Sequence, residues 1–168
     1  NPLKHLTDTS GDEYPTKTLK VLYEYSQRGE RGCAELLLKR FEDETLYNHD
    51  TKEWLKYYNG VWVKDSISNI TWRSQKFLLE VFPEVARIVE GQEFRLKQLA
   101  RDDSDNELEL KREASRYKKY AQSFDKTKKA ITYKKTSDQI LALLATEEDM
   151  GTATTDFDQH PLLINLQN

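Results

Sequence analysis

The dipeptide Asn59-Gly60, which lies between two short runs rich in aromatic residues, constrains the fold of this chain most strongly. Glu53–Tyr58 (EWLKYY) precedes it and Val61–Asp65 (VWVKD) follows it. Asn-Gly readily accepts the positive φ angles that both central residues of a two-residue type I′ turn require. The stretch therefore predicts a β-hairpin with one strand on each side of the turn.

A further short strand is expected at Thr45–Tyr47, joined to the hairpin by a turn at Asn48–Asp50. Because an isolated hairpin is only marginally stable in water, we expect a three-stranded antiparallel meander with one face against helices. Alternate residues of the middle strand face opposite sides of the sheet: Trp54, Lys56 and Tyr58 on one side, Leu55 and Tyr57 on the other. The aromatic residues fit two roles, cross-strand packing or a stacking platform for single-stranded nucleic acid.

The rest of the chain has mainly helical periodicity. We expect helices over about residues 15–25, 30–41, 71–82, 84–100, 105–132 and 136–144. Pro83 is expected to end or kink the helix that precedes it. Ser104 with Glu107, and Thr136 with Gln139, fit the capping-box pattern at the starts of the last two helices.

The apolar stripe of the helix at 71–82 is assigned to Trp72, Phe77, Leu78 and Val81. Residues 65–69 are expected to be a polar connection, 147–154 a loop, and 154–158 (TTDFD) a short strand. The expected fold class is α+β, mainly α. It consists of a helical bundle, a small antiparallel β-meander at about residues 45–65, and a short C-terminal strand.

Charge is strongly segregated along the chain, although the net charge is only −3. Residues 111–135 contain ten Lys and Arg against two acids, a local net charge of +8. Such a stretch is either a solvated surface that balances the acidic remainder or a surface that contacts a phosphate backbone. The candidate nucleic-acid-binding residues are Arg116, Lys118, Lys119, Lys126, Lys128, Lys129, Lys134 and Lys135. Tyr117, Tyr120, Phe124 and Tyr133 are interleaved with them.

No residue pattern points to a catalytic centre or a metal site. The three histidines, His5, His49 and His160, lie far apart, and none has a second ligand at helical or hairpin spacing. Phosphate-loop, dinucleotide-binding and nucleophile-elbow motifs are absent from the sequence. The single cysteine, Cys33, excludes an intrachain disulfide and is expected to be a small buried or half-buried apolar residue rather than a reactive thiol. No apolar run approaches the roughly 18 residues of a membrane span.

Both ends of the region from Arg28 to Asn168 resemble one family, the domain that precedes the superfamily-3 helicase core in phage, plasmid and poxvirus primase-helicases. The N-terminal positions that match its pattern are Gly32, Ala34, Glu35, Tyr47, Trp54, Asn59-Gly60 and Trp62. The C-terminal positions are Phe157-Asp158, Pro161, Leu162-Leu163, Asn165 and Asn168. Cys33 departs from the family, where a polar residue is more usual, and so does the highly charged region 101–135.

The resemblance implies a non-catalytic accessory domain that links primase to the helicase ring and helps to form a collar on it. Residues 1–26 would be a leader with a short helix, and 27–168 a single domain within a longer polypeptide. No cofactor is expected in this chain, whereas ATP and Mg²⁺ would bind a downstream motor domain. Expected partners are the helicase and primase domains of the same protein. DNA is a possible further partner, a hypothesis that comes from the basic residues and not from the resemblance. A hexamer is expected only for the full-length protein, and the expected location is the cytoplasm of a bacterial host. The alternative is a purely structural protein–protein interaction or oligomerisation module without nucleic-acid binding.

Overall fold

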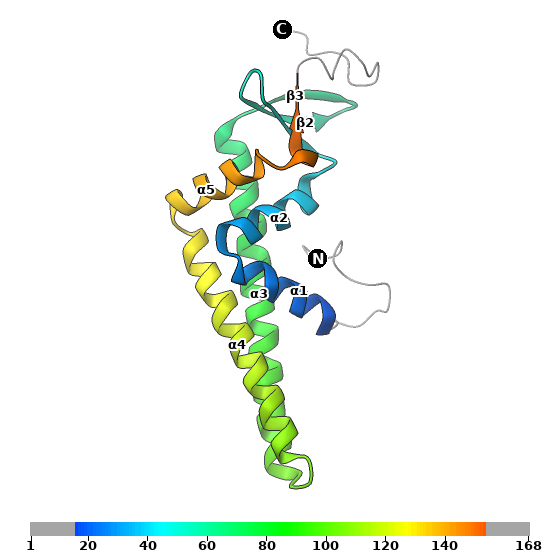
Figure 1. Cartoon of the computed structure of the whole chain (residues 1–168), viewed down its shortest axis with the longest axis vertical. Helices are drawn as coiled ribbons and strands as arrows, with labels where there is room; N and C mark the ends of the chain where they lie inside the picture. Colours follow the sequence, from blue (N-terminus) through cyan, green and yellow to red (C-terminus); the bar gives the residue numbers. More distant parts are fainter. Residues whose placement is uncertain (1–15, 154–168) are drawn as a thin grey trace.

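The computed structural model describes residues 16–153 and shows a mainly helical α+β fold, which confirms the predicted class (Figure 1). Within these residues there are five α-helices, one short 3-10 helix and one four-stranded sheet. In chain order the elements are α1 (Thr16–Gln27), α2 (Gly29–Phe41), β1 (Thr45–Asn48), β2 (Glu53–Tyr58), β3 (Val61–Asp65), α3 (Ile67–Asp102), α4 (Glu107–Ile131), α5 (Lys134–Leu144), η1 (Glu148–Met150) and β4 (Gly151–Thr152).

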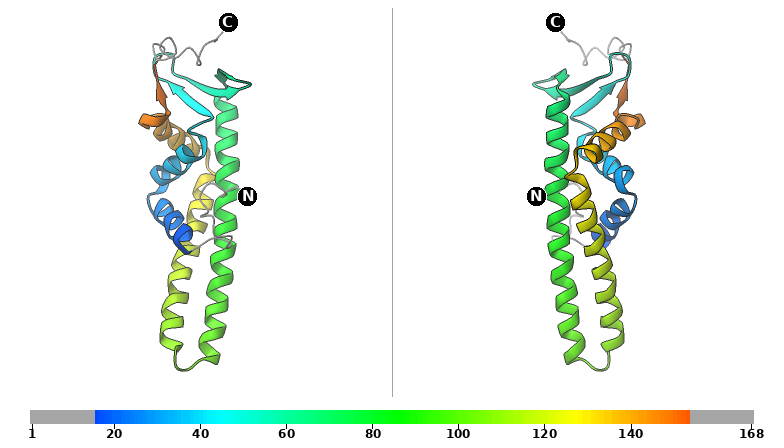
Figure 2. Two further views of the ribbon diagram at one scale, coloured as in Figure 1. Left: turned by 90° about the vertical axis from the view of Figure 1, so that its right-hand side faces the viewer. Right: turned by 90° about the vertical axis from the view of Figure 1, so that its left-hand side faces the viewer.

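Two long antiparallel helices, α3 and α4, form the axis of the molecule (Figure 1). Helices α1, α2 and α5 lie together on one side of α3, along the half of the hairpin nearer the sheet (Figure 2). The sheet lies at the end of the molecule where α3 begins, and the other end of the α3–α4 hairpin projects without further elements around it (Figures 1 and 2). We call this projecting end, with the turn at 103–106, the arm.

The Asn59-Gly60 turn forms as predicted. Asn59 has φ of 50° and Gly60 has φ of 85°, and Tyr58 pairs with Val61 across the two-residue loop. Positive φ at both central positions is what a type I′ turn requires. Strands β1, β2 and β3 are antiparallel neighbours, so the predicted meander is confirmed.

The sheet contains a fourth strand that the sequence did not predict. β4 pairs in parallel with β1, and the His49 amide donates a hydrogen bond to the Thr152 carbonyl at 2.9 Å. The loop expected at 147–154 is therefore wrong over η1 and β4, because pairing with a distant strand decides the conformation there. The strand expected at 154–158 and the family-like tail at 157–168 lie outside the described residues, as does most of the leader before residue 16.

The two faces of the sheet have different apolar contacts. Trp54 is buried in the main core with residues of the helices, as the alternation predicts. Leu55 and Trp62 are buried together on the opposite face, with Leu46 packed against them. One face therefore attaches the sheet to the helical body, and the other carries a small apolar cluster of its own.

Helix α3 is longer than predicted, because it begins at Ile67 and passes through Pro83 without interruption. The polar connection expected at 65–69 is wrong, since the Ser66 side chain caps the helix by accepting a hydrogen bond from the Asn69 amide at 3.1 Å. Of the two outcomes expected at Pro83, an end or a kink, the end is wrong. Phe82 and Val85, on either side of Pro83, are fully buried in the core. Their packing outweighs the lost backbone hydrogen bond.

Neither predicted capping box forms. Before α4, the Asp103 carboxylate accepts hydrogen bonds from the amides of Asp105 and Asn106, both at 3.2 Å, and the N-cap position of α4 is Asn106. Helix α5 begins at Lys134, so Thr136 lies inside its first turn rather than at its N-cap. Asp103 therefore stabilises the turn between α3 and α4 rather than capping α4.

Helices α1 and α2 cross at Gly32. A Cβ atom at this position would lie 1.9 Å from the carbonyl oxygen of Tyr25 in α1. Leu19 and Leu22 of α1 share the core with Leu36 and Leu37 of α2. The close approach of the two backbones is what brings these side chains together.

We expect Gly32→Ala to lower the free energy of unfolding by about 3 kcal/mol, because the methyl group must push α1 away from α2. Urea unfolding followed by circular dichroism measures this. Gly91→Ala is the matched control: Gly91 lies in α3 with no atom within 4 Å of the added Cβ. This control should gain up to about 1 kcal/mol from helix propensity. Equal stabilities of the two variants would contradict the close crossing.

Cys33 is buried in α2, as the sequence predicts. Burial, with a smaller contribution from the negative charge of Glu30, raises the pKa of its thiol to about 12. We expect a disulfide reagent at pH 8 to react at least about a hundredfold more slowly with the native protein than with the protein in guanidinium, because only the thiolate is nucleophilic. Cys33 is the only thiol, so absorbance of the released chromophore measures it directly. Similar rates in the two states would disprove the burial.

Candidate nucleic-acid interface

Helix α4 packs through its aromatic residues. Tyr120 stacks on Tyr23 of α1 with ring centroids 4.4 Å apart, and Phe124 lies 6.1 Å from Phe82 of α3. Burial raises the pKa of the Tyr120 hydroxyl. Tyr117 is buried beside them, so three of the four aromatic residues interleaved with the basic stretch belong to the core. They are not available for stacking on bases.

The basic side chains occupy the opposite side of α4 and the beginning of α5. Of the eight predicted residues, all are exposed except Lys128, which is half-buried. Three of them form ion pairs within the helix: Arg116 with Glu113 at 2.9 Å, and Lys128 and Lys129 with the single carboxylate of Asp125 at 2.7 and 3.4 Å. Hydrogen bonds from these lysines, chiefly from Lys128, hold the pKa of Asp125 below its usual value.

The other five have no ion pair to any residue between 16 and 153, and we call them the unpaired lysines. They are Lys118, Lys119, Lys126, Lys134 and Lys135. Lys119 and Lys126 are two helical turns apart and therefore lie on the same side of α4. Lys134 and Lys135 follow the turn from α4 into α5 (Figure 1).

Sequence reasoning missed one member of this surface. Arg112 lies seven residues before Lys119, is exposed, and has no ion pair within the described residues. The seven-residue spacing of Arg112, Lys119 and Lys126 was the signal that could have identified it. With it, the unpaired positive charge extends along much of the outer side of α4.

Only some of the aromatic residues that the sequence offered for stacking are exposed. Trp54 and Trp62 are buried, which excludes them from a stacking platform, whereas Tyr57 and Tyr58 at the hairpin tip are exposed. Trp72, assigned to the buried stripe of α3, is 58% exposed. That assignment is wrong because Trp72 lies five residues before Phe77, out of step with the three- and four-residue spacing of the buried face.

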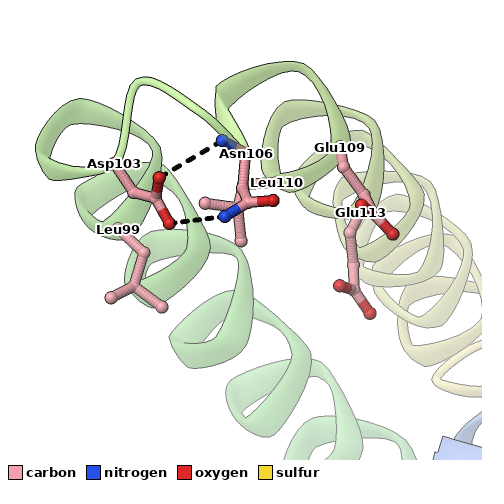
Figure 3. Close-up of a pocket in the computed structure, with 6 residues that line it drawn as sticks. All are labelled: Leu99, Asp103, Asn106, Glu109, Leu110 and Glu113. Atoms are coloured by element: carbon pink, nitrogen blue, oxygen red, sulfur yellow. Dashed lines mark hydrogen bonds between the residues drawn. The ribbon is translucent and has the colours of Figure 1, made fainter.

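A hollow of about 290 Å³ at the arm turn is lined mainly by acidic and apolar residues (Figure 3). Its lining residues are Leu99, Asp103, Asn106, Glu109, Leu110 and Glu113. The Asp103 carboxylate is used by the turn itself, since the Asn106 side chain donates to it at 2.9 Å (Figure 3). These hydrogen bonds keep the pKa of Asp103 below its usual value. The negative lining makes this hollow unsuitable for phosphate.

Within residues 16–153, no three His, Cys, Asp or Glu side chains are grouped so that they could hold a metal ion. His49 is exposed, with its ring edge against Tyr47, while His5 and His160 lie outside the described residues. None of the helices in this part of the chain is both long and apolar enough to cross a membrane.

A protein-family model described as D5 N terminal like matches residues 34–168. The match takes in most of α2, the sheet, the α3–α4 hairpin and α5. No curated protein and no solved structure matches the chain significantly. The family resemblance inferred from the motifs at the two ends of the chain is confirmed. The chain belongs to the D5 N terminal like family, the domain that precedes the superfamily-3 helicase in primase-helicases.

Proposed function

We propose that this chain is a non-catalytic accessory domain of a DNA primase-helicase that links the primase to the helicase ring and contacts DNA. The observation that carries the proposal is the set of unpaired lysines on one side of α4 and at the start of α5. Neutralising such charges with phosphates releases condensed counterions from the DNA, which provides affinity without reading the sequence. Family membership supports the replication setting.

The reaction chemistry is assigned to other domains of the parent protein. The sequence has no phosphate-binding loop motif. ATP and Mg²⁺ would bind the helicase motor, whose hexameric ring this domain would cap as part of a collar. The phage, plasmid or other mobile-element origin and the bacterial cytoplasm belong to the same proposal.

We expect the protein to bind fluorescein-labelled DNA with a strong dependence on salt. If four lysines each contact one phosphate of a single strand, the slope of log K against log salt is roughly −3. Fluorescence anisotropy over a salt series measures it. A slope near zero, or no binding at low salt, would contradict DNA contact.

The variant Lys118→Gln/Lys119→Gln/Lys126→Gln should reduce this slope by about 2 and weaken binding by about tenfold or more at 0.1 M salt. The matched control, Lys52→Gln/Lys64→Gln/Lys97→Gln, removes the same charge from exposed positions outside the basic surface. It should leave the slope nearly unchanged. Equal losses in the two variants would indicate a non-specific effect of net charge.

A second candidate function, a protein-interaction or oligomerisation module, is favoured by the surface of the arm. Three large apolar side chains are exposed there: Phe94 and Leu99 on α3, and Leu108 on α4. Apolar side chains that remain in water on a projecting element are typical of a docking surface. This function is compatible with DNA contact, because the arm and the unpaired lysines occupy different parts of the molecule.

If the arm mediates self-association, sedimentation velocity should show a concentration-dependent rise in the mass of the protein. Phe94→Ser/Leu108→Ser should then keep it monomeric, because these two side chains contribute the apolar area that association would bury. The control Tyr58→Ser/Ile67→Ser removes two similarly exposed large side chains near the sheet and should not change the association. A monomer at every concentration would exclude oligomerisation by this chain.

A further inference from the structure

One face of α3 near the sheet carries an exposed tryptophan beside a lysine. Trp72, Gln75, Lys76 and Leu79 follow the spacing i, i+3, i+4 and i+7, which places them on the same side of the helix. The Gln75 side-chain nitrogen donates a hydrogen bond to the Ser137 hydroxyl of α5 at 2.7 Å. This contact brings the face against the first turns of α5.

Two large aromatic rings remain in water about one helical turn along the chain from this contact: Trp72 is three residues before Gln75, and Tyr133 is four residues before Ser137. Trp72 is 58% exposed, and the Lys76 ammonium lies 5.1 Å from the centroid of its ring. Tyr133, which precedes α5 directly, is 67% exposed, and its side chain makes no capping hydrogen bond. The other two tryptophans of the chain, Trp54 and Trp62, are buried. Trp72 is thus the one tryptophan whose ring a ligand could reach.

Unpaired positive charge lies next to each ring: Lys76 beside Trp72, and Lys134 and Lys135 directly after Tyr133 in the chain. Lys134 and Lys135 occupy the first turn of α5, where the positive end of the helix dipole makes cations unfavourable and where no acidic residue is present. Glu80 and Asp138 are the acids one turn away along α3 and α5, and neither pairs with Lys76, Lys134 or Lys135. A bound anion would relieve the repulsion that the fold leaves uncompensated.

We propose that the junction of α3 and α5 is a binding site for single-stranded DNA, in which bases stack on Trp72 and Tyr133. Lys76, Lys134 and Lys135 would contact the phosphates that link these bases. Exposed rings alternating with cations are the combination that binds single strands, since each base offers a flat face and each linkage a charge. Duplex bases are stacked on one another, so the site favours the single strand. This proposal rests on the DNA contact proposed above, and it specifies that the DNA is single-stranded and that its bases stack on aromatic rings.

Tryptophan fluorescence tests the stacking directly. Titration with an oligothymidylate should quench the emission, because Trp72 is the exposed tryptophan among the described residues. Trp72→Ala should weaken binding by between about fivefold and about a hundredfold, the range for loss of one stacked base. Trp72→Phe should abolish the quenching and keep affinity within about threefold. Phe94→Ala removes a similarly exposed ring from the same helix, and it should change neither the affinity nor the quenching.

A charge variant separates binding from folding. Lys134→Gln/Lys135→Gln should weaken binding to the oligothymidylate. The melting temperature of this variant should nevertheless equal or exceed that of the wild type, because the substitutions remove cations from the positive end of a helix.

Wild-type affinity of Trp72→Ala, with reduced affinity of the Lys118→Gln/Lys119→Gln/Lys126→Gln variant, would overturn the stacking site and leave the proposed function standing. Equal affinity for single strand and duplex would also overturn it. Absence of binding to both would overturn both proposals.

Discussion

The packing of Phe82 against Phe124 is the interaction on which the rest of the structure depends. Both side chains are fully buried, and their ring centroids lie 6.1 Å apart between α3 and α4. A proline inside a helix costs about 3 kcal/mol, whereas burial of each large apolar side chain contributes about 1.5 to 3 kcal/mol. The contacts of Phe82 and Val85 thus offset the cost of Pro83 and keep α3 continuous. Helices α1, α2 and α5 all pack along the half of the α3–α4 hairpin that this core stabilises.

The same packing explains why α4 can present so much unpaired charge. Its aromatic residues, Tyr117, Tyr120 and Phe124, provide the buried contacts, and the lysines on its outer side contribute nothing to them. Charge repulsion among these lysines opposes folding slightly. A fold that needs only the inner side of a helix leaves the outer side free to be selected for another property.

Local chemistry decided which parts of the fold could be predicted. The Asn59-Gly60 turn was predictable because positive φ angles are a property of the two residues themselves. The continuity of α3 through Pro83 was not, because it depends on contacts with α4. For the candidate site, the sequence located the basic residues but not their surroundings. Trp72 was assigned to the apolar stripe of its helix, and the nearby hydrogen bond between Gln75 and Ser137 joins residues 62 positions apart in the sequence.

Distance along α3 allows the two candidate functions to operate together. Trp72 and Phe94 are 22 residues apart in one continuous helix, a rise of about 33 Å at 1.5 Å per residue. A strand of DNA held at the junction of α3 and α5 would therefore not reach the apolar surface of the arm unless it extended over several nucleotides. Because α3 is one continuous helix, a protein docked at the arm would be connected directly to the proposed DNA-contacting surface. In the proposed function, the uninterrupted helix through Pro83 would supply the connection between a docked partner and the bound DNA.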